Sequence, residues 1–281
     1  MIDLHVHSTA SDGTLTPEKL AAAGRNFTLM ALTDHDNVDG VGSFLAECAR
    51  IGVAGRRLAG VELSVQPGEG YGQFHMLGLG LDHANARLAA FLERIRDGRD
   101  ERNRKMCEKL AGLGCAFDMS ELDKYAKGEV VARPHIARVM MDHGWAKSVA
   151  DAFERYLKPG RPAYVARYRP TPEEAIEVIH EAGGAAVMAH PRYWTDDSAK
   201  LLSGLVRLKD AGLDGVEAVY QANKRHETVE HLRVAREVGL AVTAGSDFHG
   251  ANKPTIKLGM KVAEESAFIA PLLELLERRS K

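Results

Sequence analysis

The sequence predicts an α/β protein whose parallel sheet closes into a barrel, and three observations support this. Short apolar segments alternate with amphipathic ones along most of the 281 residues, which is the pattern of strands and helices in a parallel sheet. The chain is long enough to bury the core of one α/β barrel, or of two smaller domains. Polar side chains of ligand type follow many expected strands, as they do at the mouth of a barrel.

The first expected strand places two histidines side by side. Apolar and polar side chains alternate over residues 2–7, so His5 and His7 project from the same face of an extended chain. Asp12 lies just beyond the strand, before a turn marked by Gly13. Two imidazoles and a carboxylate can begin a metal site, although a strand with two incidental histidines has the same pattern.

The alternation continues up to about residue 82. A helix is expected over residues 16–24, with Thr16 as its N-cap and Gly24 as its stop. One more helix and three strands follow, and a ligand-type residue lies in or just after each strand. They are helix 41–52, strand 27–32 before His35, strand 58–65 with Glu62, and strand 73–79 with His75.

The chain then changes character, because no strand is expected between about residues 97 and 163. Apolar residues at helical spacing predict one long helix or two over 85–114 and short helices at 134–143 and 148–157. The basic residues in the middle of the long segment alternate with acids, which favours a solvated helix face. We interpret 97–163 as a helical insertion that forms a substrate-binding lid, and 1–96 with 164–281 as the barrel.

Strands and helices alternate again from Thr171, which caps a helix over 172–182 with Glu174 as its capping-box partner. Three strands follow, each with polar residues at its end. They are strand 185–189 before His190, strand 213–220 before Gln221 and Asn223, and strand 240–244 before Asp247 and His249. Further helices are expected at 199–211, 226–238 and 266–279.

The composition excludes several classes of protein. The chain has 37 Lys and Arg against 39 Asp and Glu, which argues against a broad polyanion-binding surface but not against a local anion pocket. No apolar run could span a membrane, and no secretory signal is visible. The cysteines, Cys48, Cys107 and Cys115, are scattered and form no disulfide framework or thiolate metal site. We expect a cytoplasmic protein without a membrane partner; the sequence does not predict its oligomeric state.

Nine histidines and carboxylates at the expected strand ends form the candidate metal site. Each one alone could be a core or loop residue, but nine such coincidences are hard to dismiss. Imidazole and carboxylate ligands without sulfur suit Mn²⁺, Fe²⁺ or Zn²⁺, and Mg²⁺ less well. Since one ion needs about four protein ligands, we expect two or three divalent ions. The nine residues are His5, His7, Asp12, His35, Glu62, His75, His190, Asp247 and His249.

The order of these motifs resembles that of the polymerase and histidinol phosphatase (PHP) superfamily. The resemblance implies a distorted (β/α)7 barrel with a trinuclear metal site, for which we expect Mn²⁺ as the first choice of ion. It assigns His5, His7, Glu62 and Asp247 to one ion, Glu62, His75 and His190 to a second, and Asp12, His35 and His249 to a third. The motifs are His5-Val6-His7-Ser8 with Asp12, Thr33-Asp34-His35-Asp36, Gly60-Val61-Glu62, Phe74-His75, Ala189-His190-Pro191 and Ser246-Asp247-Phe248-His249.

Within the superfamily, the sequence Val131-Ala132-Arg133-Pro134-His135-Ile136-Ala137 resembles one branch with a small helical insertion. Members of that branch are phosphatases of nucleoside 3′,5′-bisphosphates or 5′-to-3′ exonucleases of short oligoribonucleotides. The resemblance therefore implies a small-molecule nucleotide as substrate, such as 3′-phosphoadenosine 5′-phosphate, with short RNA as the alternative.

A doubly phosphorylated nucleotide needs a second anion site besides the metals. We expect Arg133 and His135 near a helix start, with Lys158 and Arg161, to provide it. Each of these could instead be a surface cation, and His135 a helix cap. Further candidates for substrate contacts are Gln221 and Asn223, which could bind ribose or base, and Ser8.

The predicted function is hydrolysis of the 3′-phosphate of a nucleoside 3′,5′-bisphosphate. A metal-bound hydroxide is the expected nucleophile, and His190, Asp247 and His249 are candidate proton donors. The first alternative is a 5′-to-3′ exonuclease that uses the same ligands. The second is histidinol phosphate phosphatase, for which an acidic pocket would be expected in place of Arg133 and Lys158. The third is a metal-binding domain without turnover.

Overall fold

The computed structural model describes residues 1–126, 131–262 and 265–279. The chain divides into two compact units. Unit 1 contains Met1–Leu92 and Pro170–Lys281, and unit 2 contains Glu93–Arg169. Unit 2 includes the range 97–163 in which we expected a helical insertion.

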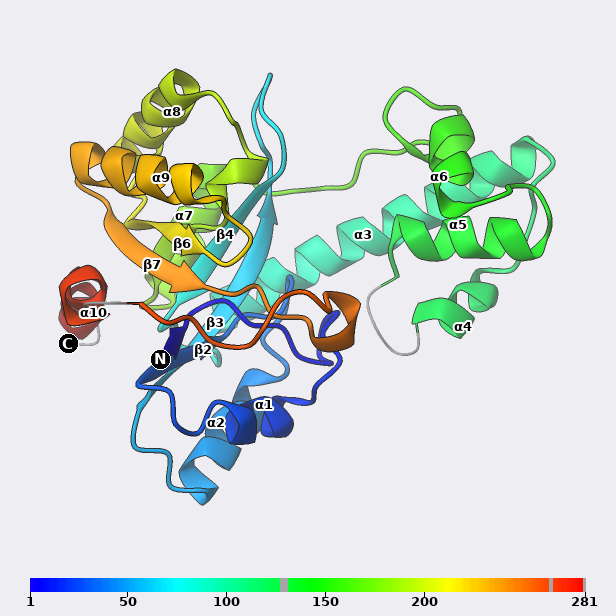
Figure 1. The fold of residues 1–281 in the computed structure, drawn as a ribbon. Coiled ribbons are helices and arrows are strands. Elements are labelled where there is room, and N and C mark those ends of the chain that lie inside the picture. The colour runs from blue at the N-terminus through cyan, green and yellow to red at the C-terminus, as the bar shows by residue number, and fades with distance from the viewer. Residues whose placement is uncertain (127–130, 263–264, 280–281) are drawn as a thin grey trace. The chain divides into compact units, whose positions relative to one another are not determined.

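Unit 1 is built around a seven-stranded sheet in which the strands follow one another in chain order (Figure 1). Strands next to each other in sequence are neighbours in space, as expected for a barrel. Just after β1, the Leu4 amide donates to the Ala244 carbonyl at 3.0 Å, which joins the first strand to the last. The strands are β1 (Ile2–Asp3), β2 (Leu29–Leu32), β3 (Arg56–Val65), β4 (Phe74–Leu79), β5 (Ala185–Met188), β6 (Gly215–Tyr220) and β7 (Ala241–Gly245).

One strand corrects the expectation of a wholly parallel sheet. Strand β4 pairs antiparallel with both β3 and β5, while the other pairs are parallel. The segment between Val65 and Phe74 is too short for a crossover of a dozen residues, so β3 and β4 form a hairpin. His75 is therefore at the start of its strand and not at its end. It nevertheless lies at the barrel mouth because β4 runs in the opposite direction.

Helices cover the outside of this sheet, and their ends follow the sequence signals. The Thr16 hydroxyl accepts the Lys19 amide at the start of α1, and Thr171 and Glu174 form a reciprocal capping box at α7. Together, the seven-stranded sheet and the helices outside it confirm the expected distorted (β/α)7 barrel. These helices are α1 (Pro17–Ala23), α2 (Val41–Arg50), α7 (Pro172–Glu181), α8 (Ser198–Asp210), α9 (Arg225–Val238) and α10 (Glu265–Arg279).

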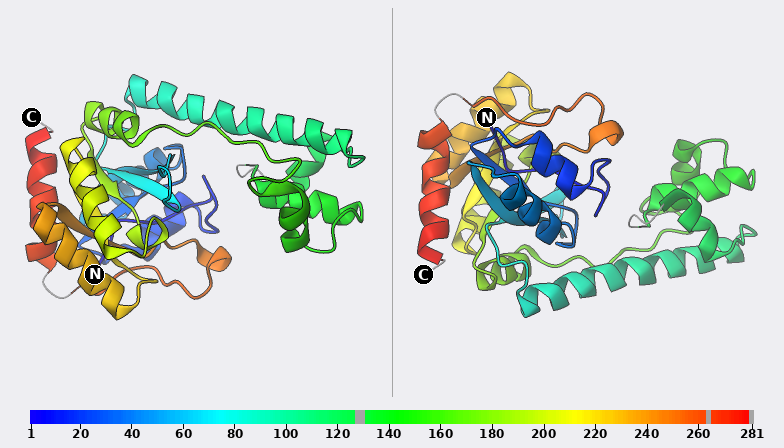
Figure 2. Two further views of the ribbon diagram at one scale, coloured as in Figure 1. Left: turned by 90° about the horizontal axis from the view of Figure 1, so that it is seen from above. Right: turned by 90° about the horizontal axis from the view of Figure 1, so that it is seen from below.

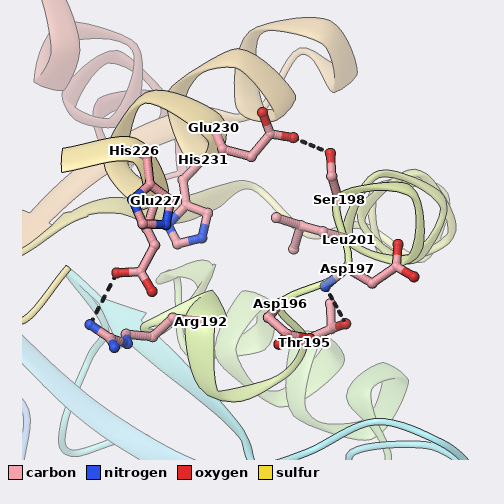
Figure 3. A pocket seen from close by; sticks show the side chains of 10 residues that line it. All are labelled: Arg192, Thr195, Asp196, Asp197, Ser198, Leu201, His226, Glu227, Glu230 and His231. Carbon is pink, nitrogen blue, oxygen red and sulfur yellow. Dashed lines mark hydrogen bonds and ion pairs between the residues drawn. The ribbon is translucent and has the colours of Figure 1, made fainter. Parts of the chain in front are cut away.

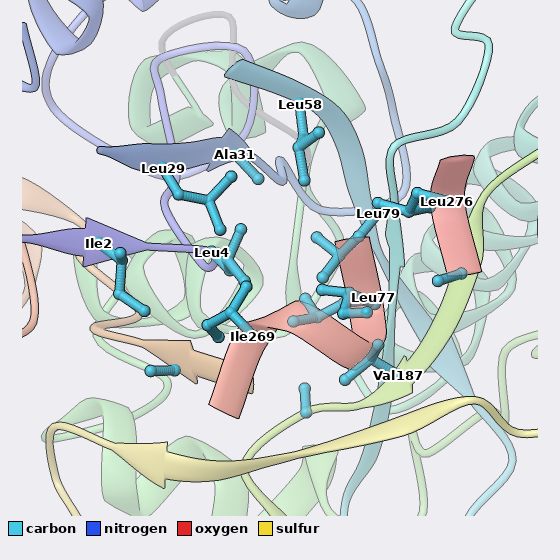
Figure 4. Close-up of a cluster of buried hydrophobic side chains, with 14 residues drawn as sticks. Ile2, Leu4, Leu29, Ala31, Leu58, Leu77, Leu79, Val187, Ile269 and Leu276 are labelled. Atoms are coloured by element: carbon cyan, nitrogen blue, oxygen red, sulfur yellow. The ribbon is translucent and has the colours of Figure 1, made fainter. Parts of the chain in front are cut away.

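The main core of unit 1 joins the strands to the C-terminal helix. Figure 4 shows side chains from β1, β2, β4 and β5 directed toward those of α10, with Leu4, Leu77 and Ile269 among them. Leu77 and Leu272 are fully buried. Burying one such side chain contributes about 1.5–3 kcal/mol, so this core fixes the scaffold from which the loops at the mouth extend.

Unit 2 is helical in all of its described secondary structure and has its own core. Figure 2 shows α3 (Ala86–Gly112) as one uninterrupted helix. Met106 and Leu110 of this helix pack with Ile136, Met140 and Leu157. The other elements are a 3-10 helix (Met119–Leu122), α4 (Asp123–Ala126), α5 (Arg133–Asp142), α6 (Val149–Ala152) and a π-helical turn (Phe153–Leu157).

The solvated face expected for the basic segment of α3 is only partly present. Arg104 and Lys105 are exposed and pair with acids on the same helix. Arg99 and Arg102, by contrast, are 8% and 7% exposed. The prediction failed for these two arginines because they are buried inside unit 2, where Arg102 lies close to Arg133 and Arg167.

Across the described residues, no helix combines the length and apolar character that crossing a membrane requires.

Candidate metal centre

The strands of unit 1 and the loops after them bring all nine candidate ligands together. The described residues form three groups in which ligand atoms lie within 4.8 Å of one another. One group equals the set expected for the first ion, and one contains the set expected for the third together with His7. The groups are His5, His7, Glu62 and Asp247; His7, Asp12, His35 and His249; and His35, Glu62 and His75.

Glu62 is the centre of the cluster. It lies in the middle of β3 and is fully buried. Its two oxygens face different histidines, so one carboxylate can bridge two ligand sets. His190 completes the second expected set through this contact. Oε2 lies 3.2 Å from His5 Nε2, 3.2 Å from His7 Nε2 and 2.9 Å from His35 Nδ1. Oε1 lies 2.7 Å from His75 Nδ1 and 2.9 Å from His190 Nε2.

The pKa values show how strongly these groups depend on one another. Burial alone would raise the pKa of Glu62, but His35, His5 and His75 hold it well below its ordinary value. Burial opposes protonation of His7 as well, yet Asp247 and Glu62 raise its pKa to about 9. His75 shows the opposite result, since burial lowers its pKa to about 4. The cluster therefore needs positive charge among its carboxylates, which divalent cations supply.

The donor atoms also fit a metal. Several buried atoms directed into the cluster lie within ion-pair distance of one another but make no hydrogen bond of good geometry: His5 Nε2, His7 Nε2, His35 Nδ1 and Glu62 Oε2. Buried polar atoms without partners are costly, and here they are the atoms that would coordinate an ion. Nitrogen and carboxylate donors without sulfur are typical of Mn²⁺, Fe²⁺ and Zn²⁺ sites.

Two candidate ligands occupy strained backbone positions. His190 and Asp247 have φ angles of 27° and 59°, in the left-handed region that residues other than glycine seldom adopt. Each lies in the turn just after a strand, β5 or β7. Such strain costs on the order of 1–3 kcal/mol and is typical of functional sites. In this conformation both side chains point into the cluster.

A second layer of polar side chains supports the ligands, and the sequence analysis did not single it out. Tyr220 and Lys253 donate to Oδ2 of Asp247 at 2.9 and 2.6 Å. Glu217 lies 3.1 Å from Nδ1 of His5. A signal for Glu217 was present, because it is a carboxylate inside an apolar strand, as Glu62 is.

The candidate substrate residues of unit 1 make structural contacts. Ser8 is buried and donates its hydroxyl and amide to Asp34, each at 2.7 Å. Gln221 exchanges hydrogen bonds with the backbone of Lys257. Asn223 donates to the Ala218 carbonyl at 3.2 Å. Their roles toward a substrate stay predictions.

The candidate anion residues of unit 2 differ in how their charge is balanced. Lys158 pairs with Glu154, and Arg161 lies 3.7 Å from the same carboxylate. His135 caps its helix, because Nδ1 accepts the Ala132 amide at 3.2 Å. Arg133 lies over the ring of Phe153 and donates to the Leu157 carbonyl, and within the described part of the chain it pairs with no carboxylate.

Unit 1 also has a small pocket of about 110 Å³ beside α8 and α9 (Figure 3). An ion pair between Arg192 and Glu227 forms one wall, and Ser198 donates to Glu230 at another. The pocket contains acids and two histidines. Among the described residues, however, they bring no three ligand atoms within 4.8 Å of one another, so this pocket is not a further metal group.

The model of the PHP domain family matches residues 3–158, so the chain belongs to this family. It is 39% identical over 253 residues to a 3′,5′-nucleoside bisphosphate phosphatase of Chromobacterium violaceum, covering 88% of this chain and 87% of the relative. It is 37% identical over 264 residues to the 5′-3′ exoribonuclease Rnm of Salmonella typhimurium, covering 92% and 88%. A solved amidohydrolase of Chromobacterium violaceum with bound sulfate and no metal superposes with a TM-score of 0.79 at 35% identity, covering 99% and 96%.

Proposed function

We propose that this protein is a metal-dependent phosphomonoesterase that removes the 3′-phosphate of nucleoside 3′,5′-bisphosphates. The products are a nucleoside 5′-phosphate and inorganic phosphate. The observation that carries the proposal is the convergence of imidazoles and carboxylates on Glu62. The 39% identity to a 3′,5′-nucleoside bisphosphate phosphatase over most of both chains supports this choice of substrate.

The proposal includes two or three divalent ions, with Mn²⁺ as the first choice and Fe²⁺, Zn²⁺ or Mg²⁺ as alternatives. His5, His7, Glu62 and Asp247 would hold one ion, Glu62, His75 and His190 a second, and Asp12, His35 and His249 a third. When bound, such ions activate water and stabilise the charge on the phosphoryl and leaving oxygens.

The protein's own residues orient these groups and handle protons. Tyr220 and Lys253 hold Oδ2 of Asp247, so that Oδ1 is presented to His5 and His7. His190, Asp247 and His249 remain the candidates that donate a proton to the leaving oxygen. Of these, His249 has Nδ1 fixed at 2.8 Å from the Asp247 carbonyl, which leaves Nε2 to face Asp12 at 3.1 Å.

A second anion site in unit 2 would recognise the phosphate that is not cleaved. We call five residues the arginine cluster: Arg99, Arg102, Arg133, Arg167 and Arg169. Burial, followed by the positive charges of the other four members, lowers the pKa of Arg102 to about 9. Its Nε is buried without a hydrogen-bond partner. A bound anion would relieve this repulsion, which supports a lid function for the insertion at 97–163.

A 5′-to-3′ exonuclease of short RNA is the second candidate function. The relative of that name from Salmonella typhimurium covers 92% of this chain, and the same metal ligands could serve it. Histidinol phosphate phosphatase is less well supported, because the arginine cluster is not the acidic pocket that a cationic amine requires. A metal-binding domain without turnover is disfavoured by the presence of all nine ligands.

The proposed setting is a reducing cytoplasm. All three cysteines are free thiols, and two of them, Cys48 and Cys115, are buried. No disulfide therefore contributes to the fold.

The test is phosphate release from 3′-phosphoadenosine 5′-phosphate by the purified protein with added Mn²⁺. We expect the catalytic efficiency on this bisphosphate to exceed that on AMP and on 3′-AMP at least tenfold, because only the bisphosphate occupies both anion sites. Equal efficiencies on all three would contradict the two-anion account. A 5′-phosphorylated RNA oligomer, resolved as a ladder, tests the exonuclease alternative under the same conditions.

A further inference from the structure

Glu217 is a buried carboxylate that the proposed reaction does not use. It lies in β6 and has no exposed surface. A carboxylate removed from water must be paired or hydrogen-bonded, because otherwise its burial is very unfavourable. Its partners in the described chain show what it does.

The first partner is a metal ligand. Both oxygens of Glu217 face Nδ1 of His5, at 3.1 and 3.3 Å. With Nδ1–H directed at the carboxylate, the lone pair of His5 lies on Nε2, which faces Glu62 and Asp247 at 3.2 and 3.6 Å. A carboxylate behind the second ring nitrogen fixes the tautomer and orientation of a metal-binding histidine and makes it more basic.

The second partner is the strained turn at another ligand. Oε2 of Glu217 accepts the backbone amide of His190 at 2.8 Å. This residue has a φ of 27°, and its Nε2 lies 2.9 Å from Oε1 of Glu62. Glu217 therefore stabilises a backbone conformation that would otherwise be unfavourable. One carboxylate thus acts on two ligands that belong to different expected ions.

The neighbouring strand leaves space for this arrangement. A Cβ atom on Gly245 of β7 would lie 2.2 Å from Oε1 of Glu217 and 2.4 Å from Cβ of His5. Both distances are shorter than real Cβ contacts allow. A glycine at this position is what permits Glu217 and His5 to meet.

Other buried carboxylates near the centre have a different role. Asp3 accepts the amide and hydroxyl of Ser246, and Asp34 accepts the hydroxyls of Ser8 and Ser11. Among the described residues, neither makes a hydrogen bond to a ligand imidazole. Their contacts fix loops, whereas Glu217 contacts a ligand ring directly.

We propose that Glu217 is a positioning residue that sets the affinity of the centre for its divalent ions, by holding the His5 ring and the His190 turn. This inference rests on the metal centre of the proposed function. It does not depend on which phosphate ester is cleaved.

The test is titration of the metal-free protein with Mn²⁺ by calorimetry, and in parallel with Zn²⁺, for the wild type and Glu217→Gln. The amide keeps the size of the side chain but removes its charge. We expect the dissociation constant to rise about 10–100-fold. Excess Mn²⁺ should restore most of the turnover number, because the ligands themselves are intact.

Asp214→Asn is the matched control, since it neutralises another largely buried carboxylate of unit 1 whose partners are Arg279 and His180. It should leave Mn²⁺ affinity within twofold of the wild type. If Glu217→Gln does not fold, as judged by circular dichroism, Glu217→Asp takes its place, because it keeps the charge but withdraws the carboxylate from Nδ1 of His5, and the same loss of affinity is expected.

Wild-type Mn²⁺ affinity in a folded Glu217→Gln protein would overturn the inference and leave the proposed function standing. Equal loss of affinity in Asp214→Asn would overturn it too, because the effect would then be one of general stability. If the wild type binds Mn²⁺ but releases no phosphate from the bisphosphate, the proposed function fails while the role of Glu217 is still decided by the titration. A wild type that binds neither ion would overturn both.

Discussion

The metal centre of unit 1 and the arginine cluster of unit 2 both hold buried charge, but they balance it differently. In the metal centre, carboxylates that carry negative charge lie within hydrogen-bond distance of imidazoles that can carry positive charge, and Glu62 contacts five rings. In the arginine cluster, the charges that act most strongly on Arg102 are those of other arginines. The carboxylates of the first arrangement attract cations, and the second arrangement is the one that we propose for an anion.

This difference underlies the proposal that the chain takes a substrate with two phosphates. In the proposed reaction, metal ions would neutralise the phosphate to be cleaved, and the guanidinium groups would offer planar, bidentate donors to the other. Breaking either arrangement should have a separable effect. Loss of the first should abolish the chemistry, and loss of the second should weaken binding of bisphosphates alone.

The largest effect is expected for Glu62→Gln, which breaks the metal centre. The amide cannot balance two ions, and several kcal/mol of transition-state stabilisation are lost with them. Phosphate release should fall by at least about 1,000-fold. Elemental analysis should show that the variant retains fewer ions per chain than the wild type. Unchanged stoichiometry and rate would exclude Glu62 as a bridging ligand.

A smaller effect is expected for Arg102→Gln in the arginine cluster. Loss of one charge-assisted hydrogen bond costs about 1.5–3 kcal/mol, so KM for the bisphosphate should rise about 10–100-fold. Arg104→Gln is the matched control, because Arg104 is on the same helix but exposed and paired with Glu108. It should change KM less than twofold. A rise in KM for 3′-AMP as large as that for the bisphosphate would argue against a second anion site.

The smallest effect is expected for Asp214→Asn. Asp214 balances its charge in a third way, by pairing with a cationic side chain, Arg279, and with His180. Burial would raise its pKa, but His180, Arg279 and the Ala186 amide lower it below the ordinary value of 3.8. A depressed carboxylate pKa stabilises the fold above the unfolded-state value, and this stability is lost as the pH falls. Chemical unfolding should show Asp214→Asn less stable by about 1–2 kcal/mol at pH 7, with the difference shrinking below about pH 4. A difference that grows on acidification would contradict this assignment.

The sequence predicted the convergence of the nine candidate ligands better than it predicted the rest of the molecule. Ligand-type residues at strand ends can be recognised from the sequence alone. Because a barrel places its strand ends together, their meeting can be predicted as well. The antiparallel β4 was missed, although the short segment between Val65 and Phe74 was a signal for a hairpin. Glu217 was also missed, even though it shares with Glu62 the position of an acid in an apolar strand.

The arginine cluster could be predicted only in part. Arg133 was identified through its place at a helix start, but Arg99 and Arg102 were assigned to a solvated face. Their burial follows from packing of α3 against the rest of unit 2. Local sequence gives no signal for this, because acids and bases alternate along the helix. Tertiary contacts decide which of its arginines are buried.

The most direct test of the account is the anomalous scattering of Mn²⁺ in crystals of the wild-type protein grown with that ion. The account predicts at least two peaks within coordination distance of Glu62, one of them also beside His5, His7 and Asp247. Crystals that show well-ordered Glu62 with no peak near it would contradict the claim that distant strand ends share a cluster of divalent ions.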